Sequence, residues 1–88
     1  MAVVHIPAHM RTLSGGRDRV EVQGRTLRQV IEALAAACPG MRELLLDDDQ
    51  IRPEMAIAID GVVAESGLVE PVPEHAEIHL IPAIAGGH

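Results

Sequence analysis

The chain has 88 residues, a length that favours one small domain. Its formal net charge of −6 and its lack of phenylalanine, tyrosine and tryptophan argue against nucleic-acid binding, which uses basic side chains on phosphates and aromatic rings under bases. A single cysteine, Cys38, excludes an internal disulfide, and no apolar run is long enough to cross a membrane, so we expect a cytoplasmic protein with neither nucleic-acid nor membrane partners.

The first part of the chain is predicted to form a β-hairpin. Residues 2–8 are rich in valine and isoleucine, which favour a strand. Residues 13–18 contain a Gly-Gly pair and polar side chains typical of a turn. Residues 19–23 alternate polar and apolar side chains, as a half-buried strand does. We therefore expect two strands joined by a rather long loop.

The clearest helix follows this hairpin. Thr26 and Gln29 form the T-x-x-Q pattern of a capping box. Pro39-Gly40 predicts the end of the helix. Between them, apolar residues recur at the spacing of one helix face: Leu27, Val30, Ile31, Leu34 and Cys38. Because Cys38 lies on this apolar stripe, we expect its thiol to be buried and unreactive.

The segment after the helix carries weaker signals. Residues 41–46 predict a short helical turn with Leu44 and either Leu45 or Leu46 packed inward. The acidic run over residues 47–49 is predicted to be a solvated loop, because such charge runs are normally exposed. It lacks the alternating ligands and central glycine of a calcium loop.

Three further strands are predicted in the second half. Residues 55–59 form one strand, and Asp60-Gly61 is a strong hairpin-turn signal that leads into a short return strand at Val62-Val63. An irregular stretch held by two prolines then leads to the last strand.

The last strand is predicted over residues 77–81. Alternation along it places Ile78 and Leu80 on the inner face. His79 and Ile81 then lie on the opposite face of the sheet.

This order of elements predicts an α+β domain with one main helix packed across a mixed sheet of four to five strands. The right-handed crossover rule places the last strand in the centre of the sheet, parallel to the first strand. We divide the chain into this domain, over residues 1–82, and a flexible tail over residues 83–88.

No catalytic or metal-binding motif stands out in the body of the chain. There is no nucleophile elbow, phosphate loop or metal-ligand spacing, so we predict no catalytic residue and no metal site. The histidines are expected to be surface or half-buried side chains: His5, His9, His75, His79 and His88.

The end of the chain is the remaining candidate. Pro82 begins a small, uncharged segment that runs to Gly86 and Gly87. A Gly-Gly pair alone is typical of a frayed end. However, glycine has no Cβ, so such an end can also enter a narrow channel and present its carboxylate to another active site.

Residues 73–87 resemble the end of the ubiquitin-like sulfur carriers of the ThiS/MoaD family. That family typically ends in an acidic turn, an apolar strand, a proline-containing link and Gly-Gly. The resemblance extends over essentially the whole chain, and residues 6–7, 11–16 and 24–31 look most like the actinobacterial type used in cysteine biosynthesis. The family adopts the β-grasp (ubiquitin-like) fold, which agrees with the order of elements predicted above.

The resemblance implies a carrier that is not an enzyme and binds no cofactor itself. In such proteins a ubiquitin-activating-type enzyme uses ATP to adenylate the terminal carboxylate, which here would be that of Gly87. Sulfur then displaces AMP and leaves a thiocarboxylate. By the same resemblance Gly86 keeps the tail narrow, while Ile81, Ala83 and Ile84 dock on partner proteins.

Several biosynthetic pathways, and two other classes of protein function, stay open. Cysteine biosynthesis is favoured, with a PLP-dependent synthase as sulfur acceptor and a metallopeptidase that releases the amino acid. Thiamine or molybdopterin biosynthesis comes next, the latter with this chain as the small subunit of molybdopterin synthase beside a large subunit. The alternatives are a protein modifier joined to lysines through Gly87, and an interaction domain with an inert tail.

His88 follows Gly87, so the carboxyl carbon that should react is held in a peptide bond. We expect this chain to be a precursor from which a peptidase removes His88 before activation. The alternative is that His88 was added by cloning.

Overall fold

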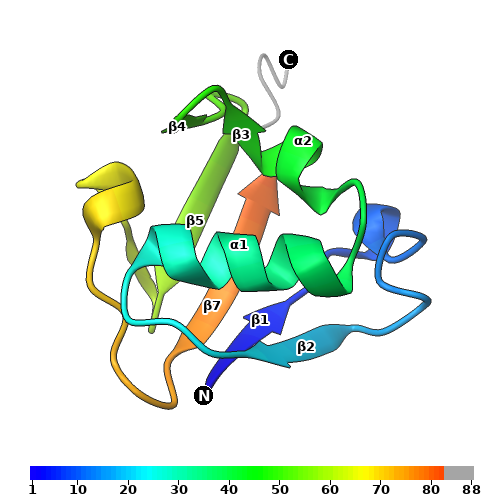
Figure 1. Ribbon diagram of the computed structural model, residues 1–88, viewed down its shortest axis with the longest axis horizontal. Helices are drawn as coiled ribbons and strands as arrows, with labels where there is room; N and C mark the ends of the chain where they lie inside the picture. The colour runs from blue at the N-terminus through cyan, green and yellow to red at the C-terminus, as the bar shows by residue number, and fades with distance from the viewer. Residues whose placement is uncertain (83–88) are drawn as a thin grey trace.

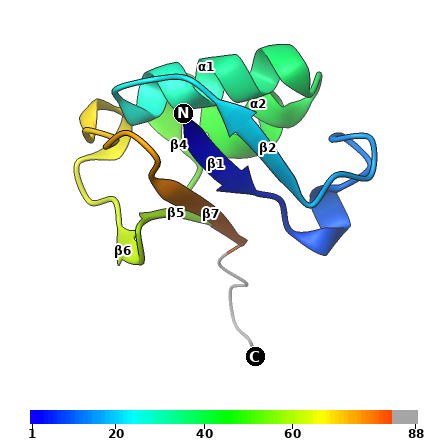
Figure 2. The same cartoon turned by 90° about the horizontal axis from the view of Figure 1, so that it is seen from below.

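The computed structural model describes residues 1–82, so the predicted tail over residues 83–88 lies outside the described part. Within it, a five-stranded mixed sheet is covered on one face by helix α1 (Leu27–Ala37) (Figure 1). The view from below shows α1 and the shorter helix α2 (Met41–Leu45) on the same side of the sheet (Figure 2). The α+β class and the single main helix are therefore confirmed.

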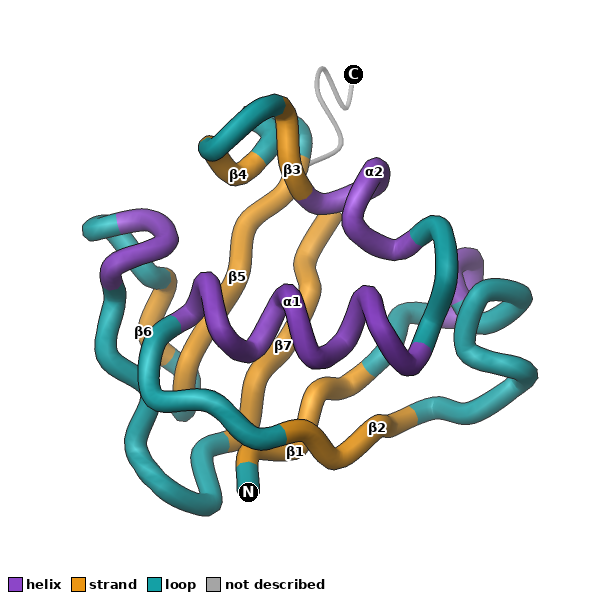
Figure 3. Tube along the Cα trace, viewed as in Figure 1, coloured by secondary structure: helices purple, strands orange, loops and turns teal. Residues whose placement is uncertain are grey.

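Strand β7 lies at the centre of the sheet, whose order is β2-β1-β7-β5-β6. Strand β1 runs parallel to β7, and the other neighbouring strands are antiparallel. Figure 3 shows β7 passing between β1 and β5 behind α1. The predicted central position of the last strand, parallel to the first, is confirmed. The strands span β1 (Ala2–His5), β2 (Arg19–Val22), β5 (Met55–Ile59), β6 (Val62–Val63) and β7 (Glu77–Pro82).

Strands β1 and β2 form the predicted hairpin, and the loop between them is held by side chains. The loop begins with a 3-10 turn, η1 (Ala8–Met10). The guanidinium of Arg11 donates from Nε to the carbonyl oxygen of Ile6 at 3.0 Å. Ser14 is buried, and its hydroxyl donates to the carbonyl oxygen of Arg17 at 2.6 Å. These contacts satisfy polar groups that would otherwise be unpaired under the loop.

Helix α1 begins at the predicted cap. The side-chain oxygen of Thr26 accepts a hydrogen bond from the backbone N–H of Gln29 at 3.3 Å. The Gln29 side chain reaches back and accepts from the backbone N–H of Arg25 at 2.7 Å, one residue before the cap itself. At the other end Cys38 is fully buried, and Gly40 takes a φ of 92°, which a residue with a Cβ rarely adopts.

Helix α2 (Met41–Leu45) confirms the predicted helical turn but corrects which leucines face inward. Met41 and Leu45 are fully buried and Leu46 is 5% exposed, whereas Leu44 is 43% exposed. Residues four apart share one face of a helix, so Met41 and Leu45 take the inward positions together. The prediction that Leu44 packs inward is wrong.

An ion pair joins α2 to α1. The guanidinium of Arg42 donates to the carboxylate of Glu32, and both side chains are partly exposed. This hydrogen bond, together with the negative charge of Glu32, raises the pKa of Arg42. The pair links α2 to the middle of α1, although exposed ion pairs of this kind contribute little stability.

A small second hairpin was not predicted. Strands β3 (Leu46–Asp47) and β4 (Gln50–Ile51) pair antiparallel, so Asp47 belongs to a strand and not to a loop. Asp48 has a φ of 57° at the turn, a conformation that aspartate tolerates better than most residues. The side chains over residues 47–49 are exposed, as expected for the acidic run.

The predicted turn between β5 and β6 is confirmed and also contacts β7. Asp60 and Gly61 have φ values of 51° and 87°, the positive pair that a tight two-residue hairpin needs. The Asp60 side chain accepts a hydrogen bond from the backbone N–H of Glu77 at 2.9 Å, and the Asp60 N–H donates to the Glu77 carbonyl at 2.8 Å. The turn therefore holds the start of β7.

The core lies between α1 and the sheet and is made of aliphatic and sulfur-containing side chains. Leu68, from the 3-10 turn η2 (Gly67–Val69), and Val72 close one end of it. No described helix is long and apolar enough to cross a membrane. The largest fully buried side chains are Ile6, Met10, Leu27, Ile31, Leu34, Met41, Leu45, Ile57 and Ile78.

Replacing Ile31 by alanine is expected to destabilise the domain by about 2–4 kcal/mol, because it leaves a cavity where the side chain is only 1% exposed. Chemical denaturation measures the change. Val69→Ala is the matched control, because Val69 is 74% exposed and its truncation should change stability by less than about 0.5 kcal/mol. Equal effects of the two substitutions would contradict this description of the core.

Candidate functional site

Strand β7 determines where the last segment of the chain leaves the domain. It pairs with β1 as far as His79, and with β5 as far as Pro82, opposite Met55. Its inward side chains, Ile78 and Leu80, are 1% and 5% exposed. The chain is thus held by packing and by ladder hydrogen bonds up to the point where the predicted tail begins.

Of the residues predicted to act, only Ile81 falls within the described part of the chain. Its side chain is 41% exposed and lies next to Ala56 of β5, on the face of the sheet away from α1. The other predicted site residues lie outside the described residues: Ala83, Ile84, Gly86, Gly87 and His88.

Within residues 1–82 both helices lie on one side of the sheet, which leaves the face that carries Ile81 open (Figure 2). We call it the open sheet face. Register places Ala58 and Val63 in one row across β5 and β6, and Val63 is 49% exposed. Ala58 itself is buried, so Val63 and Ile81, with the half-buried Ala56, supply the exposed apolar surface on this side of the face. An exposed apolar surface of this kind is typical of a contact with another protein.

A groove of about 400 Å³ lies at the carboxyl end of β7. Its apolar wall includes Leu44, which is 43% exposed. Charged groups form the rest of the rim, where the Arg52 side chain donates from Nε to the carbonyl oxygen of Glu43 at 2.7 Å. The lining residues are His9, Met10, Glu43, Leu44, Arg52, Glu54, Met55 and Pro82.

The thiol of Cys38 is not accessible for chemistry. The residue is fully buried under α1, as predicted, and carries no exposed sulfur atom that a donor could reach. A reactive cysteine is normally at least partly exposed and lies in an electropositive environment. Sulfur chemistry on this side chain would require the core to open.

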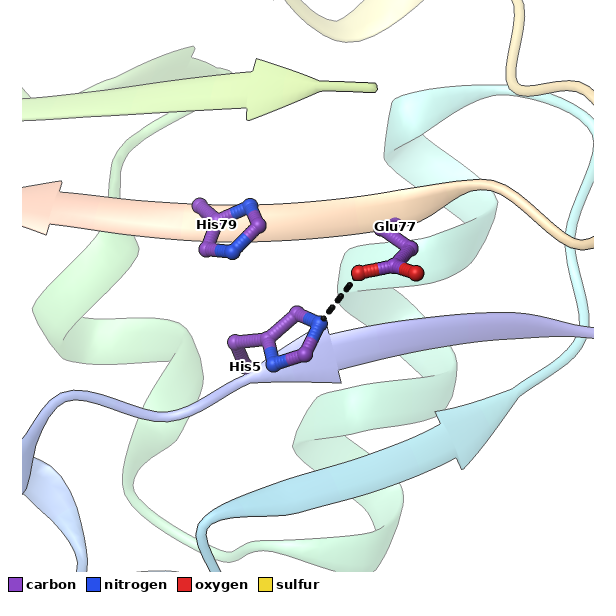
Figure 4. Close-up of side chains that lie close together, drawn as sticks. All are labelled: His5, Glu77 and His79. Carbon is purple, nitrogen blue, oxygen red and sulfur yellow. Dashed lines mark hydrogen bonds and ion pairs between the residues drawn. The ribbon is translucent and has the colours of Figure 1, made fainter. Parts of the chain in front are cut away.

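The structure brings together three side chains that sequence analysis kept apart (Figure 4). His5 lies on β1, while Glu77 and His79 lie on β7, all on the open sheet face. The two imidazole rings stack with their centroids 4.3 Å apart and an interplanar angle of 5°. Nε2 of His5 lies 3.0 Å from a carboxylate oxygen of Glu77.

Linear spacing could not reveal this cluster, because the first and last strands lie at opposite ends of the sequence. The available signal was the predicted parallel pairing of these two strands, which allows their outward-facing histidines to become neighbours. The expectation that His5 and His79 are half-buried or exposed is confirmed.

Comparison with known proteins gives consistent results for sequence and structure. The ThiS family model matches residues 4–87. The sulfur carrier protein CysO of Mycobacterium tuberculosis is 30% identical over 89 residues, which cover 96% of each chain.

Solved structures share the fold over almost the whole chain. The CysO chain in an Amycolatopsis orientalis BexX/CysO complex superposes with a TM-score of 0.93 at 25% identity, covering 99% of this chain and 100% of that one. The M. tuberculosis CysO structure gives 0.88 at 26% identity, with 96% and 100% covered. SAMP1 of Haloferax volcanii gives 0.74 at 26% identity, with 98% of each chain covered.

These matches agree with the mixed sheet and single main helix described above, and they confirm the β-grasp architecture. The chain belongs to the ThiS family of small ubiquitin-like proteins and is a carrier protein rather than an enzyme.

Proposed function

We propose that this chain carries sulfur as a thiocarboxylate on Gly87. The main supporting observation is that β7 holds the chain in the centre of the sheet up to Pro82, directly before the small residues that lead to Gly87. The burial of Cys38 argues against a persulfide on the only thiol as the carrier form. The similarity to sulfur carrier proteins named CysO supports the same conclusion.

The chemistry requires two steps, both on the carboxyl group of Gly87. A carboxylate is a poor electrophile, so one of its oxygens first attacks the α-phosphate of ATP, and pyrophosphate leaves. A sulfide equivalent then attacks the carbonyl carbon of the mixed anhydride. The new C–S bond replaces the C–O bond to AMP, which departs and leaves a thiocarboxylate. A covalent intermediate of this kind divides one difficult step into two easier ones.

Partner enzymes would perform these steps, and the chain would supply their docking surface. A ubiquitin-activating-type enzyme that holds ATP comes first, and a sulfur acceptor follows. Ile81 on the open sheet face and the groove beside Pro82 both lie next to the start of the tail. We assign Ala83 and Ile84 to the same docking surface. The A. orientalis relative, crystallised with BexX, supports a function that depends on a partner.

Cysteine biosynthesis is the pathway we favour, because the curated relatives that match over most of the chain are named CysO. The acceptor would then be a PLP-dependent synthase that supplies an activated serine, and a metallopeptidase would release the product from Gly87. Thiamine or molybdopterin biosynthesis would use the same thiocarboxylate with a different acceptor.

His88 must be removed before this chemistry can begin. In the sequence as it stands, the carboxyl carbon of Gly87 forms an amide with His88 and offers no free carboxylate to ATP. Gly86 and Gly87 lack side chains, which suits entry of the end into a narrow active site. We infer that a peptidase trims the chain to Gly87.

A protein modifier is the second candidate, because SAMP1, the small archaeal modifier protein 1 of H. volcanii, shares the fold. The chain contains no lysine, so it could not be linked into chains through its own side chains. Conjugation would add the mass of a whole second protein in a form that resists reductant. Sulfur loading instead replaces one oxygen atom by sulfur.

The sulfur-loading test compares the chain ending in His88 with a variant ending in Gly87. Each is incubated with ATP, sulfide and the adenylating enzyme of the same host, and its intact mass is measured. We expect replacement of one oxygen by sulfur only in the variant that ends in Gly87, because only there is the carboxylate free.

A variant that ends in Gly86 is the control for position, and it should load much more slowly because its carboxylate lies one residue short. Adenylation of the form that retains His88 would overturn the proposed trimming. Failure of the Gly87 form to load would overturn the carrier chemistry.

Ile81→Ala is expected to raise the KM of the adenylating enzyme for this chain by about 5- to 30-fold, the equivalent of losing about 1–2 kcal/mol at a docking contact. Val62→Ala is the matched control, because Val62 is 70% exposed but pairs with Ile59, whose side chain faces the core side of the sheet. Steady-state kinetics of adenylation measure the KM for each variant. Unchanged melting temperatures show that both variants remain folded. Identical KM values for the two variants would remove Ile81 from the docking surface.

A further inference from the structure

We propose that His5, Glu77 and His79 form a binding site for a divalent transition-metal ion of the zinc type. The site lies in the body of the domain, on the open sheet face, and its existence does not depend on sulfur carriage by Gly87. Two neutral imidazoles and one carboxylate are a donor set that zinc uses in proteins, with water as the fourth ligand.

The backbone itself places the three donors. His5 and His79 are direct partners in the parallel ladder of β1 and β7. Glu77 precedes His79 by two residues, and side chains two apart in a strand share one face. Both strands are internal in the sheet and are packed against α1 on their other face. A site on such elements is held more firmly than one on loops.

The three donor atoms lie near enough to share a single ion once the two imidazole rings rotate out of their stacked arrangement. One ligand atom from each residue can be chosen so that all three lie within 4.8 Å of one another. Nε2 of His5 is already 3.0 Å from the Glu77 carboxylate. Ligand bonds of about 2.0–2.2 Å in a tetrahedral site put ligand atoms about 3.3–3.5 Å apart. Rotating the stacked rings about their Cβ–Cγ bonds would turn a nitrogen of each toward this common point.

Solvent can reach the cluster, which leaves room for an ion and its water. The side chains of His5 and Glu77 are 30% and 63% exposed, and His79 is exposed. Figure 4 shows the three side chains projecting from the same face of the two strands. The ion would therefore bind at the surface without disturbing the core.

Charge and donor type narrow the class of ion. Imidazole nitrogen favours zinc, copper and nickel, whereas calcium and magnesium prefer sites built from oxygen alone. The formal net charge of −6 favours a cation in general. Arg19 places a positive charge near the cluster and would repel a bound cation, because it pairs with His5 across the β1–β2 ladder. However, Arg19 is exposed, and its long side chain can extend away into solvent.

Titration calorimetry of the full chain with zinc chloride, in a non-coordinating buffer at mildly alkaline pH, tests the site. We expect one zinc ion per chain. The double variant His5→Gln/His79→Gln should bind at least about tenfold more weakly, since even outer-shell changes at metal sites cost about that much. His9→Gln/His75→Asn is the matched control, because both histidines are exposed and lie outside the cluster; asparagine suits the φ of 65° at His75.

A measurement on the unaltered chain keeps the proposal testable if the double variant misfolds. One molar equivalent of zinc is expected to shift the imidazole NMR signals of His5 and His79. The signals of His9 and His75 should not move. Equal zinc affinity of the site and control variants would overturn the proposal. Shifts confined to histidines other than His5 and His79 would also overturn it.

Discussion

The main sheet of the domain is arranged around β7. This strand is hydrogen-bonded to β1 on one side and to β5 on the other, and its inner side chains meet α1. Strands β2 and β5, which flank the β1–β7 pair, run parallel to each other, so the chain between them must cross over the sheet, and α1 lies in that crossover on the face where the core forms. The Asp60 side chain and backbone secure the first residue of the strand. The last strand is therefore both the centre of the fold and the support for whatever follows Pro82.

Much of this fold is predictable because several local signals agree with the global arrangement. The Thr26 cap, the periodic apolar face of α1 and the Asp60 turn each identify one element, and the crossover rule then orders the sheet. The hairpin of β3 and β4 was missed because two-residue strands carry no periodicity and an acidic run resembles a loop. Leu44 was misplaced because a helix of one turn has too few residues to define its inner face. The neighbouring positions of His5 and His79 arise from pairing between the chain ends, which linear motifs do not encode.

In the proposed function the folded domain provides the docking surfaces, and Gly87 carries the sulfur. The described residues provide a buried aliphatic core, an open sheet face with Ile81, and a groove beside Pro82. None of these needs to perform chemistry if a partner supplies ATP and sulfur. Ile81 could be proposed from alternation along the strand, but Gly86 and Gly87 were recognised only through resemblance to a family, because a glycine pair alone has no specific physical signature. Membership of the ThiS family confirms that resemblance.

The intact mass of this protein recovered from its growing host tests sulfur carriage most directly. The account predicts a population that ends at Gly87 with one carboxyl oxygen replaced by sulfur, and that loses the sulfur on treatment with the acceptor enzyme and its activated substrate. A chain that still ends in His88 under all growth conditions, with no modified form, would contradict the account.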